Sequence, residues 1–214
     1  MIRLNIITEG HTEEQFVNKV LYQYLFERDI IVTPRNLETG NNFKKLKFNI
    51  VQWLKHDPTA WVTMMIDFYG LNDDFPGYAA HKHRQSYDKV NAVEQALKQE
   101  IDHEGLDNYR FIPYYQLHEF EAYLFSNPRL MEDWLGLDYE FRHGSFQRIR
   151  DNFPTPEHIN DSVLTAPSKR ILQIVPSYSK VADGTLIAED IGIDTIRREC
   201  FHFNEWLTRL ENIE

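Results

Sequence analysis

The chain has 214 residues, enough to bury the core of one large domain. Its 33 acidic residues outnumber 23 basic ones, giving a net charge of −10, and this excludes a broad, non-specific nucleic-acid surface, which would be basic. An acidic catalytic centre inside a local basic groove stays open. With one cysteine, no apolar run of membrane-spanning length and no signal-peptide pattern, we expect a cytoplasmic protein without disulfides or a membrane partner.

The chain begins with an alternation of strand and helix patterns. Residues 2–8 form an apolar run typical of a buried strand. Thr12 and Gln15 have the spacing of a capping box, and apolar residues then recur at helical intervals. Residues 30–33, rich in β-branched side chains, predict a second strand. The order strand, helix, strand is typical of a parallel sheet.

The same alternation continues to about residue 115. An amphipathic helix is predicted over 43–54, and the run 61–66, apolar on both faces, predicts a central strand. A helix is expected over 86–105, with Ser86 as its cap and Gly105 at its end, followed by a strand over 109–115. These patterns predict the α/β class, with a mostly parallel sheet flanked by helices.

Strand patterns fade in the second half of the chain. Residues 117–125 predict a helix or an extended bend, and short helical stretches then alternate with proline-containing loops up to a last helix over 194–211. We therefore expect an α/β core over 1–126 and a helical C-terminal appendage over 127–214, packed on that core.

Acidic residues follow three of the predicted strands. Glu9 follows the first strand, Asp67 the third, and Glu119 and Glu121 the fourth, while Glu13 lies one turn into the first helix. Parallel strands end at one edge of a sheet, so these carboxylates can converge. Convergent carboxylates repel unless a cation or a proton neutralises them. The alternative is that helix starts favour acids, which accounts for Glu13 but poorly for Asp67.

Several motifs together resemble a known family. Residues 8–13 (TEGHTE) and 65–70 (MIDFYG) resemble the Toprim domain of topoisomerases, primases and overcoming-lysogenisation-defect (OLD) nucleases. With 74–77 (DFPG), 116–121 (QLHEFE) and 166–170 (APSKR), nearly the whole chain resembles small bacterial Toprim-like proteins of unassigned function. The resemblance implies a Toprim-like, Rossmann-like sheet and Mg²⁺- or Mn²⁺-dependent phosphodiester chemistry.

The resemblance also assigns roles at the matching positions. It implies that Glu9, Glu13 and Asp67 are metal ligands and that Glu9 and Asp67 are catalytic. The second aspartate of the family is Tyr69 here, which removes one carboxylate. We expect Glu119 to replace it as a catalytic and metal-binding residue, with Glu121 as a further ligand. Asp73 and Asp74 are alternatives to these two, but the pair also fits a solvated turn.

Basic residues near these motifs are candidates for contacts with phosphate. Lys169 is the expected catalytic cation and Arg170 a substrate-binding residue, although both also fit an exposed basic helix face. Lys180 is a weaker candidate, for which a role outside the site is the favoured interpretation.

The stretch 81–84 (HKHR) is a second positively charged segment. Its His81, His83 and Arg84 are expected to contact a nucleic-acid backbone, and a solvated loop is an equally weighted alternative. No zinc site is expected, because no third ligand lies near the two histidines. His118 fits a half-buried structural histidine better than a metal ligand, and Cys200 fits the core.

These features favour an Mg²⁺-dependent Toprim-type nuclease, with DNA preferred over RNA as its substrate, in a bacterial defence or DNA-transaction system. The chain has no P-loop, so the resemblance to OLD nucleases implies a separately encoded ATPase partner. Two alternatives stay open: a non-catalytic binding or regulatory module, favoured by Tyr69, and a phosphohydrolase or nucleotidyl-transfer enzyme acting on a small substrate.

Overall fold

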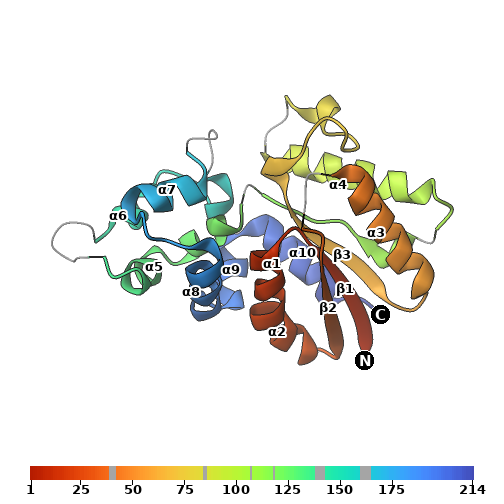
Figure 1. Cartoon of the computed structure of the whole chain (residues 1–214), viewed down its shortest axis with the longest axis horizontal. Coiled ribbons are helices and arrows are strands. Elements are labelled where there is room, and N and C mark those ends of the chain that lie inside the picture. Colours follow the sequence, from red (N-terminus) through yellow and green to blue (C-terminus); the bar gives the residue numbers. More distant parts are fainter. Residues whose placement is uncertain (39–41, 84–85, 107, 118, 138–142, 160–164) are drawn as a thin grey trace.

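A computed structural model gives the fold of the chain (Figure 1). It describes residues 1–38, 42–83, 86–106, 108–117, 119–137, 143–159 and 165–214. The strands are β1 (Ile2–Thr8), β2 (Ile30–Asn36), β3 (Trp61–Asp67), β4 (Phe111–Ile112) and β5 (Tyr115–Gln116). No helix among these residues is long and apolar enough to cross a membrane.

The strands form a parallel sheet in the order β2-β1-β3-β4, with β5 pairing β3 beyond β4. This confirms the predicted α/β class and the central place of β3. The single strand predicted over 109–115 is wrong in detail, since β4 and β5 are separate two-residue strands. Pro113 lies between them, and proline has no N–H to donate to a ladder.

Helices cover both faces of the sheet. In the first half they are α1 (His11–Phe16), α2 (Tyr22–Phe26), α3 (Phe43–His56) and α4 (Ser86–Asp102), with a π-helical turn η1 (Val17–Leu21) joining α1 to α2. Short 3-10 turns are η2 (Phe68–Gly70), η3 (Ala79–His81) and η4 (Asn108–Arg110). Leu4 and Ile6 of β1 pack in the cluster that contains Phe16, whereas Ile7 packs in the cluster under α3 and α4.

The start of α1 differs from the predicted capping box. Its N-cap is Gly10, and Thr12 is a buried residue inside the first turn. Gly10 has an extended backbone and follows β1 almost directly, so the helix begins before a side-chain cap can form. As a result, the first turn of α1, with Glu13, lies at the carboxyl edge of the sheet.

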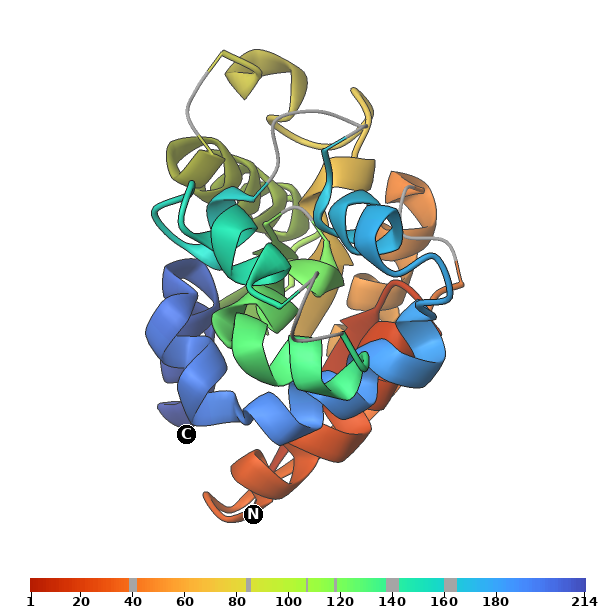
Figure 2. The same ribbon diagram turned by 90° about the vertical axis from the view of Figure 1, so that its left-hand side faces the viewer.

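The second half of the chain is helical. Its helices are α5 (Pro128–Trp134), α6 (Ser145–Arg150), α7 (Pro167–Ile174), α8 (Thr185–Ile191), α9 (Ile193–Glu199) and α10 (Phe201–Glu211), with the turns η5 (Phe120–Ser126), η6 (Pro156–His158) and η7 (Lys180–Gly184). In Figure 1, α5 to α8 lie to one side of the strands, and Figure 2 views the molecule from that side.

The predicted last helix over 194–211 is divided into two. Cys200 has a non-helical backbone and separates α9 from α10, and it is fully buried, as expected of a core residue. Trp206 of α10 lies in the same hydrophobic cluster as β1, and its Nε1 donates to Thr63 Oγ1 of β3 at 2.8 Å. The helical half thus shares the sheet's core, and a domain boundary at 126/127 stays a prediction.

A buried histidine–glutamate pair links α10 to α4. His202 Nε2 lies 2.9 Å from Glu94 Oε1, which also accepts a hydrogen bond from Tyr115 N at 2.8 Å. Glu157 accepts from the backbone N–H groups of His202 and Phe203 at the start of α10. Burial works to lower the pKa of His202, but the hydrogen bond and charge of Glu94 outweigh burial and raise that pKa above 6.5.

This pair predicts a pH-dependent contribution to stability. A raised folded-state pKa means that the native state binds more protons above pH 6.5, so the contribution of His202 is complete below about pH 6.5 and lost as the pH rises through the folded pKa. We expect Glu94→Gln to lower the free energy of unfolding most at low pH. Urea unfolding between about pH 5.5 and 9 measures this. If the difference in unfolding free energy between wild type and Glu94→Gln grew as the pH rises, this prediction would be wrong.

Candidate active site

The carboxylate of Glu9 lies over the end of β3. Glu9 N continues the ladder by donating to Met65 O at 3.3 Å, and Glu9 Oε2 accepts a hydrogen bond from Asp67 N at 2.9 Å. Gly10 then ends the strand. The ends of β1 and β3 therefore place Glu9 and Asp67 side by side, as their positions after parallel strands predicted.

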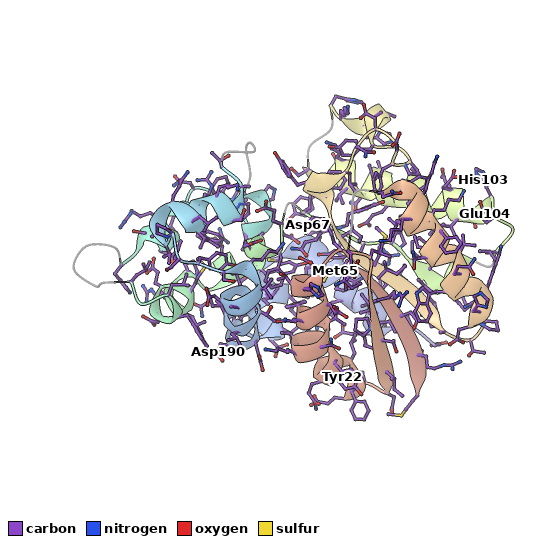
Figure 3. The ribbon with its side chains drawn as sticks, in the orientation of Figure 1. Tyr22, Met65, Asp67, His103, Glu104 and Asp190 are labelled. Carbon is purple, nitrogen blue, oxygen red and sulfur yellow. The ribbon has the colours of Figure 1, made fainter. Side chains whose placement is uncertain are left out.

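Three further contacts converge on the ammonium group of Lys180, at the start of η7. Lys180 Nζ lies 3.2 Å from Glu13 Oε1, 3.8 Å from Asp67 Oδ2 and 3.7 Å from Glu121 Oε2. We call these four residues the Lys180 cluster. Its carboxylates are 2–13% exposed and its lysine is 36% exposed, so it is open to solvent on the lysine side. Figure 3 shows Asp67 between the strand ends and the C-terminal helices.

The electrostatics of the cluster follow from burial. Burial raises the pKa of Asp67 well above its usual value; Lys180 opposes the shift, and Glu13, Glu9 and Glu121 add to it. Burial likewise raises the pKa of Glu9 and of Glu121. Burial works to lower the pKa of Lys180, but the nearby carboxylates reverse that effect and raise it. The site thus holds more negative charge than one ammonium group neutralises.

Glu119 has a structural partner of its own. Its Oε2 accepts a hydrogen bond from Ser168 N at 3.1 Å, in the first turn of α7, where Ala166 offers no side-chain cap. A carboxylate there satisfies a free N–H and complements the helix dipole. The negative charge of Glu119 also helps to raise the pKa of Glu121, which places Glu119 beside the cluster. Its metal-binding and catalytic roles stay predictions.

The structure reverses the expected order of the cationic candidates. Lys169 is exposed on α7, and no contact between it and the acids is found in the described part of the chain. Arg170 donates from Nε to Thr165 O at 2.7 Å, and its guanidinium lies 5.1 Å from the centre of the Phe153 ring. Lys180, ranked last from the sequence, is the lysine that contacts the carboxylates.

Residues 81–83 are the described part of the positively charged segment 81–84. His81 ends η3 and is partly buried, and His83 is exposed in the turn that follows. Arg84 and His118 fall outside the described residues. Between the described part of this segment and the Lys180 cluster we find no ion pair, so its contact with a nucleic acid stays a prediction.

Sequence reasoning missed Tyr178, which is buried beside the cluster. Its hydroxyl has no hydrogen-bond partner among the described residues, and a Cβ at Gly184 would lie 2.7 Å from it. Burial, and then the charge of Glu121, raise the pKa of Tyr178. The only signal in the sequence is its position two residues before Lys180. The close approach of Gly184 packs η7 against Tyr178.

The carboxylates of the Lys180 cluster are of the chemical type that binds a hard divalent cation. Mg²⁺ and Mn²⁺ prefer oxygen ligands, and both Asp67 Oδ1 and Glu121 Oε2 are buried without a hydrogen bond to any residue that the structure describes. However, within the described ranges no three His, Cys, Asp or Glu side chains stand close enough together to hold a metal ion. The carboxylates are instead arranged around Lys180 Nζ, which occupies the position of a shared cation.

The fold and this site define a parallel α/β protein with carboxylates gathered at the carboxyl edge of its sheet. The model of one family, described as "Domain of unknown function (DUF4276)", matches residues 8–211, and the chain belongs to this family. Comparison with curated proteins gave no match.

Two solved structures similar to this chain are C-terminal regions of OLD proteins. The one from Xanthomonas campestris pv. campestris is 15% identical, with a TM-score of 0.46, covering 99% of this chain and 95% of its own. The one from Burkholderia pseudomallei is 14% identical, with a TM-score of 0.45, covering 97% and 98%. At these values the likeness carries no conclusion about activity.

Removing the ammonium group should destabilise the protein in a pH-dependent way. We expect Lys180→Met to cost about 1–3 kcal/mol near neutral pH, less than for a fully buried pair because Lys180 is partly exposed. Carboxyl groups with raised pKa values contribute stability below their unfolded pKa of about 4 and lose it as the pH rises through the folded pKa. The loss should therefore shrink towards about pH 4.

Urea unfolding of wild type and Lys180→Met at several pH values measures this effect. Lys19→Met, at an exposed position of η1, is the matched control and should behave as wild type. An equal loss at all pH values would show that Lys180 stabilises the fold by packing rather than by charge.

A second prediction concerns the approach of η7 to Tyr178. Gly184→Ala would force a Cβ against the Tyr178 hydroxyl, and overpacking of this kind costs about 1–3 kcal/mol. Gly70→Ala is the control, because its Cβ would lie an ordinary 4.0 Å from Glu9 Oε1. Thermal unfolding compares the two, and a Gly184→Ala protein as stable as Gly70→Ala would contradict this packing.

Proposed function

We propose that this protein is a metal-dependent nuclease that hydrolyses phosphodiester bonds, with DNA as the preferred substrate and Mg²⁺ or Mn²⁺ as cofactor. One observation carries the proposal: buried carboxylates from β3, α1 and η5 meet around a single cationic group at the carboxyl edge of a parallel sheet. Ligand sites of open α/β sheets lie at this edge. The Toprim-like motifs over 8–13 and 65–70 contain three of the acids.

In this proposal the acids divide into two neighbouring groups. Glu9 and Asp67 hold the cation from the strand ends, and Glu13 and Glu121 bind it from the helical side. A divalent cation bound there supplies Lewis-acid polarisation of a phosphoryl oxygen and lowers the pKa of bound water. Burial raises the pKa values of Asp67 and Glu121, so these groups bind a proton more readily than exposed carboxylates do when the cation is absent.

Lys180 supplies the cationic contact to substrate. Its Nζ lies within 3.8 Å of three carboxylates and its side chain reaches solvent, so the ammonium group can turn from the acids to a phosphate oxygen. There it stabilises the extra negative charge of the transition state. Lys169 remains a second candidate for this role.

Binding of DNA is proposed to depend partly on other surfaces. A net charge of −10 disfavours a broad DNA-binding face, and His81, His83, Arg84 and Arg170 are the local candidates for phosphate contacts. A separately encoded ATPase partner in a bacterial defence or DNA-transaction system would supply the remaining substrate binding.

A second candidate function is a non-catalytic binding or regulatory module. Two observations favour it. Lys180 already neutralises part of the acidic cluster, and Tyr69, which is 37% exposed, stands where the Toprim motif has an aspartate. Such a module would keep the fold and the charge balance without turning over a substrate.

Cleavage assays on plasmid DNA and on RNA, with Mg²⁺ or Mn²⁺, separate the two functions. We expect Asp67→Asn and Glu9→Gln to abolish cleavage, because they remove metal ligands. Lys180→Met should slow it about 100-fold, the loss typical of one transition-state contact. Lys19→Met should cleave as wild type does.

Two results would contradict this proposal, the first by ruling out the assigned centre and the second by ruling out the nuclease activity. Metal-dependent cleavage that survives both Asp67→Asn and Glu9→Gln would place the chemistry elsewhere. DNA binding without cleavage, by wild type under every metal condition and with a candidate ATPase added, would favour the module. A loss of activity in Lys169→Met but not in Lys180→Met would restore the order expected from sequence.

A further inference from the structure

Gln116 is a fully buried residue whose side chain has no hydrogen-bond partner within the described part of the chain. It is 0% exposed, and neither Nε2 nor Oε1 makes a hydrogen bond to any described residue. Buried carboxamides normally pair both atoms, since an unpaired polar group in the interior costs free energy. A buried carboxamide without a partner at the edge of a site is a candidate for contact with a ligand, a water molecule or an ion.

The register of the sheet places Gln116 beside Asp67. The two residues are Cα partners in the parallel pairing of β3 with β5, and neighbouring strands lie about 4.8 Å apart. Register partners project to the same face. Tyr114 packs in the cluster on the Met65 face and Tyr115 in the opposite cluster, so alternation directs Gln116 to the face of Met65 and Asp67.

Other unpaired oxygens lie on that face at the same edge. Thr8 pairs with Met65 in register, is fully buried, and its Oγ1 has no partner among the described residues. Asp67 Oδ1 is likewise buried and unpaired. Three polar side chains at the ends of neighbouring strands therefore each have a buried atom without a hydrogen-bond partner among the described residues, on one face of the sheet at its carboxyl edge.

Resting on the proposed function, we propose that the Gln116 carboxamide is a neutral ligand-positioning group of the cation site, supplying the oxygen that Tyr69 does not. Side-chain amide oxygens are suitable ligands for hard cations, directly or through bound water. A neutral donor also suits this edge, because a further carboxylate would add repulsion to acids that one lysine already fails to neutralise. Its Nε2 remains free to donate to a neighbouring oxygen.

Binding of Mn²⁺ to the nucleic-acid-free protein, followed by the electron paramagnetic resonance signal of free Mn²⁺, tests this role without any catalytic readout. We expect Gln116→Met, which keeps length but loses both polar atoms, to weaken binding about tenfold or more. Gln116→Asn, which withdraws the oxygen by one carbon, should also weaken it, and Gln116→Glu should retain it.

Asn5→Leu is the matched control. Asn5 is a buried β1 amide whose Nδ2 has no hydrogen-bond partner among the described residues, but it alternates with Leu4 and Ile6 and so lies on the opposite face from Thr8. Its substitution should leave Mn²⁺ affinity unchanged. Thermal unfolding with and without Mn²⁺ verifies that each variant is folded and gives a second measure of binding.

The outcomes separate this inference from the function on which it rests. Wild-type affinity in folded Gln116→Met and Gln116→Asn would overturn the role of Gln116 and leave the nuclease proposal intact. Absence of Mn²⁺ binding by wild type would overturn both. An equal loss in Asn5→Leu would show that any buried amide of the sheet affects binding, and it would overturn the specific role.

Discussion

The ammonium group of Lys180 is the charge on which the arrangement of the acidic edge depends. Parallel strands bring their carboxyl ends together regardless of charge, so burying Glu13, Asp67 and Glu121 there creates repulsion that the sheet itself does not relieve. Lys180 relieves part of it, at distances of 3.2 to 3.8 Å. Burial raises the pKa values of Asp67 and Glu121, and the remaining repulsion between carboxylates adds to both shifts.

The source of this lysine explains why the helical half of the chain belongs to the site. Lys180 lies on η7, which Gly184 packs against Tyr178 and which leads directly into α8. Glu119, on the strand side, fixes the start of α7 through Ser168 N. The end of β3, the first turn of α1 and η5 therefore contribute the carboxyl groups, and η7 contributes the compensating cation together with the contacts that orient it.

The sequence predicted the acids at the carboxyl edge of the sheet. It did not predict which lysine of the helical half contacts them. Glu9 and Asp67 could be placed because they directly follow apolar runs, and strand ends converge by topology alone. The contact of Lys180 with Asp67 joins residues more than one hundred positions apart through an irregular turn. Local patterns cannot rank it above Lys169, which follows a proline at the start of a helix.

The N-cap of α1 also differs from the prediction because tertiary structure overrides a local sequence pattern. Thr12 and Gln15 match a capping box locally, but the short connection after β1 makes Gly10 the N-cap. The position of β1 therefore determines where α1 begins, and this start places Glu13 at the carboxyl edge of the sheet.

A cation bound by the acids and the ammonium group of Lys180 compete for the same carboxylate oxygens. Because the cluster holds three carboxyl groups and one ammonium group, adding a divalent cation lowers the repulsion between carboxylates without requiring the lysine to leave the site. The ammonium group would then have fewer carboxylate partners and more freedom to meet an anionic oxygen. Neutral side chains are useful ligands at such a site, because Gln116 and Thr8 offer oxygen atoms to the cation without adding negative charge. An edge with one aspartate fewer and a buried carboxamide in register with Asp67 can thus keep its number of oxygen donors while lowering the charge that must be neutralised.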